Sequence, residues 1–417
     1  MNGRPTAPAT LILVCMSCSD AAAEGDKTWW NTNWESRVAL DIEKAVEKQC
    51  PAFAAIVPVG FLGLPEGTNW NSVRVIGPAG KELPAQTDDL DGDGKITGSD
   101  ELVFLMDIKE KASRAYLYFS ADKKVARSKT FSGTDVRASF NAEGDPQFDN
   151  GAIRMSQRRY SYHLSNEDRW VSFLDGDGAL SFDAYNFSGS KVAGWKTEVA
   201  ARGPVRTVIR RISTAITPTR KARETQHPIV PARVVHEWHI YRNKKECFVS
   251  SKIENRGTGK EVLVVARGRN GLYVTPGGKY TPEDFWTAMA KPWKTWTKSM
   301  TGGRKIRRAS SGMVQGLRLS EGWFDAYTDG PSDKPRVNVG LVIHPLSVRH
   351  SLWAGERDRR FWLVVWVDKN WPKIPPRGSL WVGFWVCPHE GRPEEIRDFW
   401  QARRKIDVIP GAIETRR

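Results

Sequence analysis

The sequence is poor in cysteine and lacks the short motifs that identify several common enzyme classes. Five cysteines occur in 417 residues, and C-x-x-C spacing occurs only at Cys15 and Cys18. A zinc site built on paired cysteines is therefore not expected in the rest of the chain. The sequence also contains no G-x-S-x-G elbow, H-E-x-x-H helix, P-loop or dinucleotide-binding glycine pattern. These absences argue against serine hydrolase, zinc protease, nucleoside triphosphatase and dehydrogenase chemistry.

Helix signals and long apolar stretches are also scarce. The apolar run Ala9–Cys18 is too short to cross a bilayer as a helix, and no other segment is apolar enough to do so. Two short helices are expected, over Ile42–Lys48 and Pro393–Arg404, and the second has acids in its first turn and bases in its last. Most other segments alternate strand-forming residues with Gly, Pro, Asn and Asp turns, which predicts a mainly β fold.

The N-terminus predicts export from the cell. Arg4 precedes the apolar run, and a group of small residues ends at Ala23, where a signal peptidase could cut. We therefore predict a signal peptide over residues 1–23 and a secreted or periplasmic protein. Because Cys18 follows Ser17, attachment to the cell envelope through a lipid is an alternative. Three cysteines remain after such processing and leave one disulfide open: Cys50, Cys247 and Cys387.

The strand pattern divides the mature chain into two regions. Residues 24–128 contain short strand-like segments in the pattern of a small β-sandwich. Ala121–Thr134 is polar and poor in apolar residues, as a linker would be. Residues 129–417 contain longer strands, some alternating and some continuously apolar, which is typical of large stacked antiparallel sheets. The expected architecture is a small N-terminal β-sandwich followed by a large antiparallel β-supersandwich.

The chain carries an excess of positive charge. It has 63 Lys and Arg against 48 Asp and Glu, a formal net charge of +15. Such a charge attracts nucleic acid, anionic lipid or acidic polysaccharide. The basic residues are scattered, and neither zinc-finger spacing nor an RNA-recognition signature is present, so nucleic acid is not expected as a partner. An acidic polysaccharide or oligosaccharide is the expected partner, and a solvated basic surface is the alternative.

An acidic loop, DLDGDGKITGSDE, resembles a calcium-binding loop in its spacing. Aspartates alternate at its start, a glycine permits a tight turn, and acids recur at its end. Because a strand-like segment follows and no flanking helices are evident, we expect a structural calcium site that ties two strands together. An acidic turn without an ion is the alternative. The predicted ligands are Asp89, Asp91, Asp93, Lys95 through its carbonyl group, Asp100 and Glu101.

The segment VVHEWHIYR, which ends at Arg242, is the strongest candidate for catalysis. In a strand, Glu237, His239 and Tyr241 share one face because successive side chains alternate. His239 or Tyr241 could act as a base, Glu237 could orient it, and Arg242 could neutralise an acidic substrate. The alternative is that His239 has a structural role only.

Tryptophan is unusually frequent, with 18 in the chain. Most of these rings are expected in the core, where they bury a large apolar area. Those in the long excursion 273–308 could instead stack on sugar rings, and basic residues near strand ends could hold acidic groups. The candidate substrate-binding residues are Trp286, Trp293, Trp296, Arg267, Arg269 and His389.

Several of these segments resemble known families. Asp88–Ile108 closely resembles a segment of the DUF4861 proteins, an uncharacterised group associated with polysaccharide breakdown, in which an aspartate-rich loop runs into an apolar strand. Trp29–Ile42 resembles the opening strand of exported bacterial β-sandwich domains. Glu198–Arg210 and Cys247–Gly257 are similar to the supersandwich of galactose-mutarotase-like and polysaccharide-lyase proteins. The resemblance implies a two-part β protein that acts on glycans, and it supplies no catalytic residues.

These observations lead to three functional hypotheses. The first is an exported carbohydrate-active protein for acidic polysaccharide, whose reaction as an enzyme would be lyase β-elimination next to a uronate. The second is a non-catalytic glycan-binding or accessory surface protein. The third is epimerisation at the anomeric carbon of a sugar. Hydrolysis would instead need two carboxylates across a cleft, for which Glu237 and Glu254 are candidates.

Overall fold

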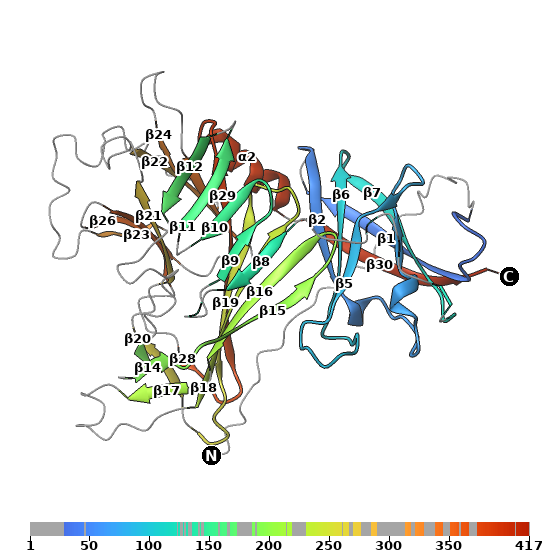
Figure 1. Cartoon of the computed structure of the whole chain (residues 1–417), viewed down its shortest axis with the longest axis horizontal. Helices are drawn as coiled ribbons and strands as arrows, with labels where there is room; N and C mark the ends of the chain where they lie inside the picture. Colours follow the sequence, from blue (N-terminus) through green and yellow to red (C-terminus); the bar gives the residue numbers. More distant parts are fainter. Residues whose placement is uncertain are drawn as a thin grey trace, which may run out of the picture. The chain divides into compact units, whose positions relative to one another are not determined.

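The fold is mainly β, as the sequence predicts, and its sheets are antiparallel (Figure 1). The computed structural model describes residues 29–416 except 46, 123, 126, 127, 129, 130, 132–135, 141, 143–145, 157, 158, 165, 166, 173–185, 188, 189, 214, 219–230, 261, 267–269, 277–284, 290–312, 318–321, 329–337, 345–350, 358, 359, 367–372 and 405. The predicted signal peptide, 1–23, lies outside these residues. The contacts separate Met1–Asn33 from Trp34–Arg417, and every feature below lies in the second unit. Within the described ranges, no helix is both long and apolar enough to span a bilayer.

Two sheets are built around the first described strands. The five-stranded sheet has the order β30-β1-β7-β3-β4, and the three-stranded sheet has the order β2-β6-β5. The strands of the first are β1 (Ser36–Lys44), β3 (Arg74–Ile76), β4 (Glu82–Leu83), β7 (Ala112–Phe119) and β30 (Ile406–Thr415), and those of the second are β2 (Cys50–Pro58), β5 (Ala85–Asp88) and β6 (Glu101–Ile108). Two short 3₁₀ turns, Val59–Phe61 and Trp70–Ser72, connect them.

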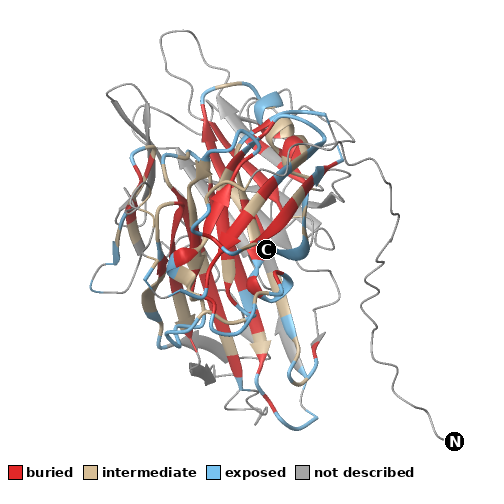
Figure 2. Ribbon diagram, turned by 90° about the vertical axis from the view of Figure 1, so that its right-hand side faces the viewer, coloured by how far each residue is buried: buried red, intermediate tan, exposed pale blue. Residues whose placement is uncertain are grey.

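These two sheets share one apolar core. Every second residue is buried from Val38 to Lys44 in β1 and from Leu102 to Ile108 in β6, as expected for strands that present one face to a core. Figure 2 shows buried residues concentrated along the strands of the molecule. The contributing side chains of these two strands are Val38, Leu40, Ile42, Leu102, Phe104, Met106 and Ile108. The helix expected over Ile42–Lys48 is therefore wrong at its start, because this alternation carries strand β1 on to Lys44.

The last strand returns to the first sheet. Strand β30 pairs with β1 from Ser36 opposite Thr415 to Lys44 opposite Ile406. The buried Arg37 of β1 forms an ion pair with Glu414 of β30 at 2.8 Å. The sequence groups this segment with residues 129–417, because the residues of a strand do not by themselves indicate a pairing partner so far away in the chain.

An eight-stranded sheet carries the candidate site. Its order is β15-β16-β18-β19-β29-β25-β24-β22. The strands are β15 (Lys196–Arg202), β16 (Arg206–Ser213), β18 (Ala232–Tyr241), β19 (Cys247–Asn255), β29 (Ser379–His389), β25 (Asn338–Ile343), β24 (Trp323–Thr328) and β22 (Phe285–Met289). The segment expected to carry the polar stripe of Glu237, His239 and Tyr241 is strand β18, and Cys247–Gly257 contains strand β19.

Two further sheets complete the described strands. The nine-stranded sheet is β23-β26-β27-β21-β12-β11-β10-β9-β8, and another five-stranded sheet is β17-β14-β13-β20-β28. The bounds of the first are β8 (Arg137–Phe140), β9 (Pro146–Asp149), β10 (Ile153–Ser156), β11 (Arg159–Leu164), β12 (Glu167–Ser172), β21 (Asn270–Pro276), β23 (Met313–Leu317), β26 (Ser351–Arg357) and β27 (Arg360–Trp366). Those of the second are β13 (Asn186–Phe187), β14 (Ser190–Ala193), β17 (Ala215–Pro218), β20 (Leu263–Ala266) and β28 (Lys373–Ile374).

The single α-helix of the described residues, α2 (Glu394–Arg403), confirms the helix expected near the C-terminus. Its buried face packs into a cluster that includes the fully buried Trp323 of β24. This face is made of Ile396 and Trp400. The helix ends at Arg403, whose side chain lines the cavity described below.

Candidate functional site

The polar face of β18 lines a cavity of about 1010 Å³. Glu237, His239 and Tyr241 all contribute to its wall, as the alternation of side chains along a strand predicts. The exposed fraction is 5% for His239 and 4% for Tyr241, and it is 19% for the side chain of Glu237. The sheet thus brings the three predicted residues into one cavity.

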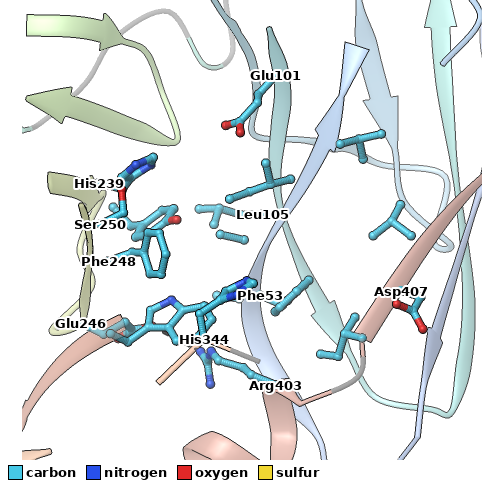
Figure 3. A pocket seen from close by; sticks show the side chains of 18 of the residues that line it. Phe53, Glu101, Leu105, His239, Glu246, Phe248, Ser250, His344, Arg403 and Asp407 are labelled. Carbon is cyan, nitrogen blue, oxygen red and sulfur yellow. Dashed lines mark hydrogen bonds and ion pairs between the residues drawn. The ribbon is translucent and has the colours of Figure 1, made fainter. Parts of the chain in front are cut away.

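The opposite wall belongs to the three-stranded sheet. Ile56 of β2 and Leu105 and Glu101 of β6 line the cavity from this side. In Figure 3, Glu101 and His239 carry their side chains toward the same space. Below them an apolar cluster that contains Val103, Val205, Tyr241 and Phe248 joins the two sheets. The cavity therefore lies where two sheets far apart in the sequence meet.

Arg206 of β16 holds this junction together through its buried guanidinium group. The residue is fully buried, and its guanidinium donates to Asp88 Oδ2 at 2.8 Å and to Glu101 Oε2. It also contacts His239 Nδ1 at 2.9 Å. Burial alone would lower the pKa of Arg206, but the charges of Asp88 and Glu101 outweigh it and raise that pKa. Removing either side of such a buried pair is costly because the remaining charge stays desolvated.

The backbone around Arg206 is fixed by Gln86 of β5. Gln86 Oε1 accepts hydrogen bonds from the main-chain N–H groups of Val205 at 2.7 Å and Arg206 at 2.9 Å. Its Nε2 donates to Asp88 Oδ1 at 2.5 Å and to the Arg206 carbonyl at 3.1 Å. The start of β16 is therefore hydrogen-bonded directly to strand β5, which limits any movement of Arg206 relative to Asp88.

Glu237 is the ionised acceptor of the site. Its carboxylate accepts from Arg210 Nε at 2.7 Å and lies 3.5 Å from His239 Nε2. Burial alone would raise the pKa of Glu237, but interactions with His239 and Arg210 outweigh it and lower that pKa to about 2. Arg210 also donates to the carbonyl oxygen of Leu90, in the acidic loop. At neutral pH Glu237 therefore accepts hydrogen bonds and is a weak base.

Tyr241 is a buried phenol next to Arg206. Burial raises the pKa of Tyr241 above its usual value of 10.0, although Arg206 partly opposes this effect. Tyr241 is therefore protonated at neutral pH and able to donate a hydrogen bond. The predicted role of Tyr241 as a base would require loss of this proton against that shift.

Aromatic rings form the floor of the cavity next to these polar groups. Phe248 stands opposite His239 in β19, and Trp385 stands opposite Phe248 in β29. The rings of Phe248 and Trp385 lie 5.0 Å apart, and His344 stacks on Trp385 at 5.5 Å. Trp381, four residues before Trp385 and on the same face of β29, extends the floor. Burial lowers the pKa of His344 to about 4, so this ring is neutral at neutral pH.

The other end of the cavity contains basic side chains. Figure 3 shows Glu246 and Arg403 away from His239. Arg403 Nη2 lies 3.3 Å from Glu246 Oε1. The Nζ atom of Lys44 donates to main-chain carbonyl oxygens, including that of Lys48 at 2.7 Å. In the described part of the chain, Lys244 also lines the cavity and forms no ion pair.

The remaining predicted catalytic and binding residues lie elsewhere. Arg242 follows the last residue of β18 and does not line the cavity. His389 at the end of β29 is buried against Asp325, with Nε2 3.0 Å from Oδ1. His389 also lies beside helix α2, because its Nδ1 atom is 3.6 Å from Glu395 Oε2. Trp286 falls within strand β22, whose side chains are not described, and Trp293, Trp296, Arg267 and Arg269 lie outside the described residues.

The acidic loop brings three of its predicted metal ligands together. Ligand atoms of Asp89, Asp91 and Asp93 lie within 4.8 Å of one another. Asp100 is fully buried and accepts from the N–H groups of Leu90 at 2.8 Å and Thr97 at 2.6 Å. The Asp100 carboxylate therefore links the start of the acidic loop to its end through these two hydrogen bonds.

The other two predicted ligands are also placed by the loop. Lys95 is exposed, and its N–H donates to Asp93 Oδ1 at 2.7 Å. Glu101 stands opposite Asp88 in the pairing of β5 with β6, so both carboxylates reach Arg206. Calcium binding by this loop stays a prediction from the sequence.

Sequence reasoning missed the residues that connect the two sheets. In the sequence Arg206 is one of several scattered basic residues within Glu198–Arg210, and nothing local distinguishes it, although it is the first residue of strand β16. Asp88 begins the segment that resembles the DUF4861 proteins and Gln86 lies two residues before it, but the local sequence does not indicate that either contacts Arg206. The sequence predicts a core position for most tryptophans and no role for Phe248, whereas Phe248, Trp381 and Trp385 line the cavity. One local signal was available. Arg206 and Arg210 share one face of β16 with Val208, which lies between them, and this pattern indicates cations on a partly apolar face.

Comparisons with solved structures find similar proteins at low sequence identity. Among solved structures, the chain is similar to an α-mannosidase from Enterococcus faecalis V583, with 10% identity, a TM-score of 0.47 and coverage of 90% of this chain and 46% of that one. It is also similar to a family GH36 α-galactosidase from Geobacillus stearothermophilus, with 9% identity, a TM-score of 0.35 and coverage of 61% and 41%. The chain thus spans less than half the length of either structure, and no curated protein matches it.

The family model of DUF4861, a domain of unknown function, matches residues 54–165. The match contains the acidic loop and strand β6, on which the resemblance in the sequence rested. It also contains Asp88 and Glu101, the two carboxylates that hold Arg206. The resemblance of Asp88–Ile108 to the DUF4861 proteins is therefore confirmed, and residues 54–165 form a DUF4861-like segment.

Proposed function

We propose that the protein is carbohydrate-active and that it binds a saccharide in the cavity between β18 and β6. The observation that carries this proposal is the placement of three polar side chains beside an aromatic floor in one cavity. Sugars present hydroxyl groups around their edges and apolar C–H faces, so a site of this composition can contact both. The glycosidase-like structures agree with this proposal in substrate class, but the proposal rests on the cavity itself.

The polar groups match the hydroxyl groups of a sugar. Glu237 is ionised and accepts hydrogen bonds, while Tyr241 keeps its proton and donates. Ser250, which lines the cavity beside Glu237, both donates and accepts. Paired donors and acceptors of this kind recognise hydroxyl groups, because an unpaired buried polar group on either partner would be costly.

The aromatic floor would supply the apolar contact. Phe248, Trp381 and Trp385 all line the cavity, and the two tryptophans are only partly buried. Rings exposed to a cavity retain apolar area that a ligand can cover. A sugar ring stacked on Trp381 would place its hydroxyl groups toward β18.

The fixed charge near β18 favours a neutral sugar at that end. Arg206 and Arg210 are both already paired with carboxylates. A uronate placed there would meet Glu237 and Glu101, and the described residues at this end offer it no arginine that is not already paired with a carboxylate. The chain as a whole is basic, so attraction of an acidic polymer would come from its outer surface and not from this end of the site.

A polysaccharide lyase for acidic glycans is the second candidate, and Lys244 is the observation that favours it. In the described residues this ammonium lines the cavity without an ion pair and could neutralise a uronate. Elimination also needs a base, and Glu237 with its low pKa and Tyr241 with its raised pKa are poorly suited to that role. Binding without catalysis, as in an accessory glycan-binding protein, is therefore the reading that the geometry supports better.

Titration calorimetry with neutral and uronate-containing oligosaccharides tests this function. We expect binding of a neutral oligosaccharide, and Trp381→Ala should weaken it about tenfold, a loss of about 1.4 kcal/mol. Trp195→Ala is the matched control, because Trp195 packs against the ring of His236, with centroids 4.9 Å apart, and does not line the cavity. Absence of binding by both ligand classes, or unchanged affinity in Trp381→Ala, would refute the proposal. Absorbance from an unsaturated product with uronate substrates would establish the lyase instead.

The predicted signal peptide leads us to place this activity outside the cytoplasm. Its apolar run is followed by small residues that end at Ala23. Mass spectrometry of the protein from its native membrane and secreted fractions would find an N-terminus near residue 24 or a lipid on Cys18. A full-length, unprocessed chain in the cytoplasm would contradict this placement.

A further inference from the structure

The contact between Arg206 and His239 decides which ring nitrogen carries a proton. Arg206 Nη1 lies 2.9 Å from His239 Nδ1, and both residues are almost completely buried. A guanidinium group has N–H donors only and does not lose a proton in proteins. The nitrogen facing it must therefore accept the hydrogen bond, so Nδ1 has no proton. A neutral His239 then carries its single proton on Nε2.

The surroundings of the imidazole oppose any other arrangement. A proton on Nδ1 would point at the guanidinium of Arg206, which cannot turn away because Asp88 and Glu101 hold it. Phe248 presents an edge-on ring at 5.4 Å and offers no hydrogen bond to the imidazole. Glu237 Oε2 is 3.5 Å from Nε2, on the opposite side from Arg206. The donor on Nε2 is therefore directed to the Glu237 side of the ring, along the cavity wall.

We propose that Arg206 is a positioning residue that locks His239 in the Nε2–H tautomer, so that His239 presents a hydrogen-bond donor to an oxygen atom of the bound saccharide. The Nε2 donor lies 3.5 Å from Glu237 Oε2, at the long limit of a hydrogen bond, so a ligand oxygen at a shorter distance would compete with Glu237 for it. The ligand in this proposal rests on the proposed function, but the tautomer follows from the Arg206 contact alone.

This arrangement assigns His239 a role opposite to the base expected from the sequence. A histidine locked with Nε2 protonated has no lone pair to offer toward the cavity, so it cannot remove a proton there without first changing tautomer. It can donate to a hydroxyl, ring or glycosidic oxygen. The carboxylates that hold Arg206 lie at the two ends of the acidic loop, at Asp88 and Glu101, so the DUF4861-like segment sets the state of a residue on β18.

Nitrogen NMR of the unmodified protein tests the tautomer directly. Full-length protein labelled with ¹⁵N in histidine gives long-range ¹H–¹⁵N correlations that distinguish the two neutral tautomers and the charged ring. The His239 signals are identified by their absence in His239→Gln. We expect the Nε2–H pattern at pH 7. A pattern of Nδ1–H, or of a doubly protonated ring, would overturn the proposal.

Arg206→Lys tests whether Arg206 is responsible. The lysine keeps one positive charge for the carboxylates but cannot reproduce the planar set of donors. We expect His239 to show a mixture of both tautomers in this variant, and saccharide affinity to fall about tenfold. A folded Arg206→Lys protein with an unchanged Nε2–H pattern would overturn the role of Arg206. Should this variant not fold, the spectrum of the unmodified protein still decides the tautomer.

The outcomes separate this inference from the proposed function. The Nε2–H pattern without saccharide binding would leave the tautomer established and refute the ligand. Saccharide binding with an Nδ1–H pattern would leave the proposed function intact and refute the role of Arg206. A change in the chemical shift of the His239 Nε2–H proton on addition of saccharide would support both the inference and the proposed function, if this change is lost in Trp381→Ala.

Discussion

Trp381 folds over Gly383, the residue two positions further along β29. A Cβ atom at Gly383 would come within 2.5 Å of the Trp381 ring and 2.6 Å of the Phe248 ring. Real Cβ atoms do not approach other atoms so closely, so both rings can occupy these positions only above a glycine. The aromatic floor of the cavity therefore depends on the absence of a side chain beneath it.

Gly383→Ala should displace the rings and weaken saccharide binding. We expect an affinity loss of about tenfold, together with a change in near-ultraviolet circular dichroism from the moved tryptophan. Gly411→Ala in β30 is the control, because its Cβ would meet Ala39 at an ordinary 3.5 Å. Equal binding and equal spectra for Gly383→Ala and the unmodified protein would show that the floor does not require this glycine.

Calcium should stabilise the protein through the acidic loop. Three carboxylates within 4.8 Å repel one another unless a cation neutralises them, and an ion that binds only the folded state raises its stability. We expect the midpoint of thermal unfolding to rise on addition of calcium and to fall with a chelator. Asp91→Asn should remove this response, whereas Glu110→Gln, an exposed acid outside the loop, should retain it. A midpoint insensitive to calcium in the unmodified protein would contradict the prediction.

His389 should stabilise the fold at low pH. Burial alone would lower the pKa of His389, but the charge of Asp325 outweighs it and raises that pKa above 6.5. The folded state therefore binds the proton more tightly than the unfolded state. This stabilising contribution is fully present below about pH 6.5 and is lost as pH rises through the raised value. Denaturant unfolding of His389→Gln across this range should show a weaker decline with pH than the unmodified protein, and an identical decline would refute the assignment.

His344 should contribute with the opposite sign. Burial lowers the pKa of His344 to about 4, so the unfolded state binds its proton more readily. The contribution is present above about pH 6.5 and is lost as pH falls toward 4. His344→Gln should therefore lose less stability between pH 6.5 and pH 4 than the unmodified protein in the same unfolding measurement. A steeper loss in the variant would contradict this prediction.

The three described cysteines should be unreactive in the folded protein. Cys50, Cys247 and Cys387 are free and buried. Burial raises the pKa of all three thiols, that of Cys247 to about 12, so almost no reactive thiolate exists at neutral pH. A thiol reagent should label these positions only after unfolding, as peptide mass spectrometry can show. Rapid labelling of Cys247 in the native protein would contradict the structure.

Local sequence pattern predicts a mainly β fold and the polar face of strand β18. The alternation in β18 placed Glu237, His239 and Tyr241 together, because neighbouring side chains of a strand must point to opposite sides. The acidic loop was likewise visible, since a regular spacing of aspartates is a local property. The same reasoning failed over Ile42–Lys48, where the pairing of β1 with two other strands outweighed the weak preference for a helix.

The sequence by itself determined a mainly β chain, a DUF4861-like segment and a polar stripe on one strand, because each depends on residues close together in the chain. Only the tertiary structure decided what faces that stripe. Arg206 contacts Asp88, Glu101 and His239. The two acidic residues are each more than a hundred positions away from it in the sequence. The tautomer that we propose for His239 thus depends on distant groups that become neighbours when the sheets pack, and no local pattern indicates that they will.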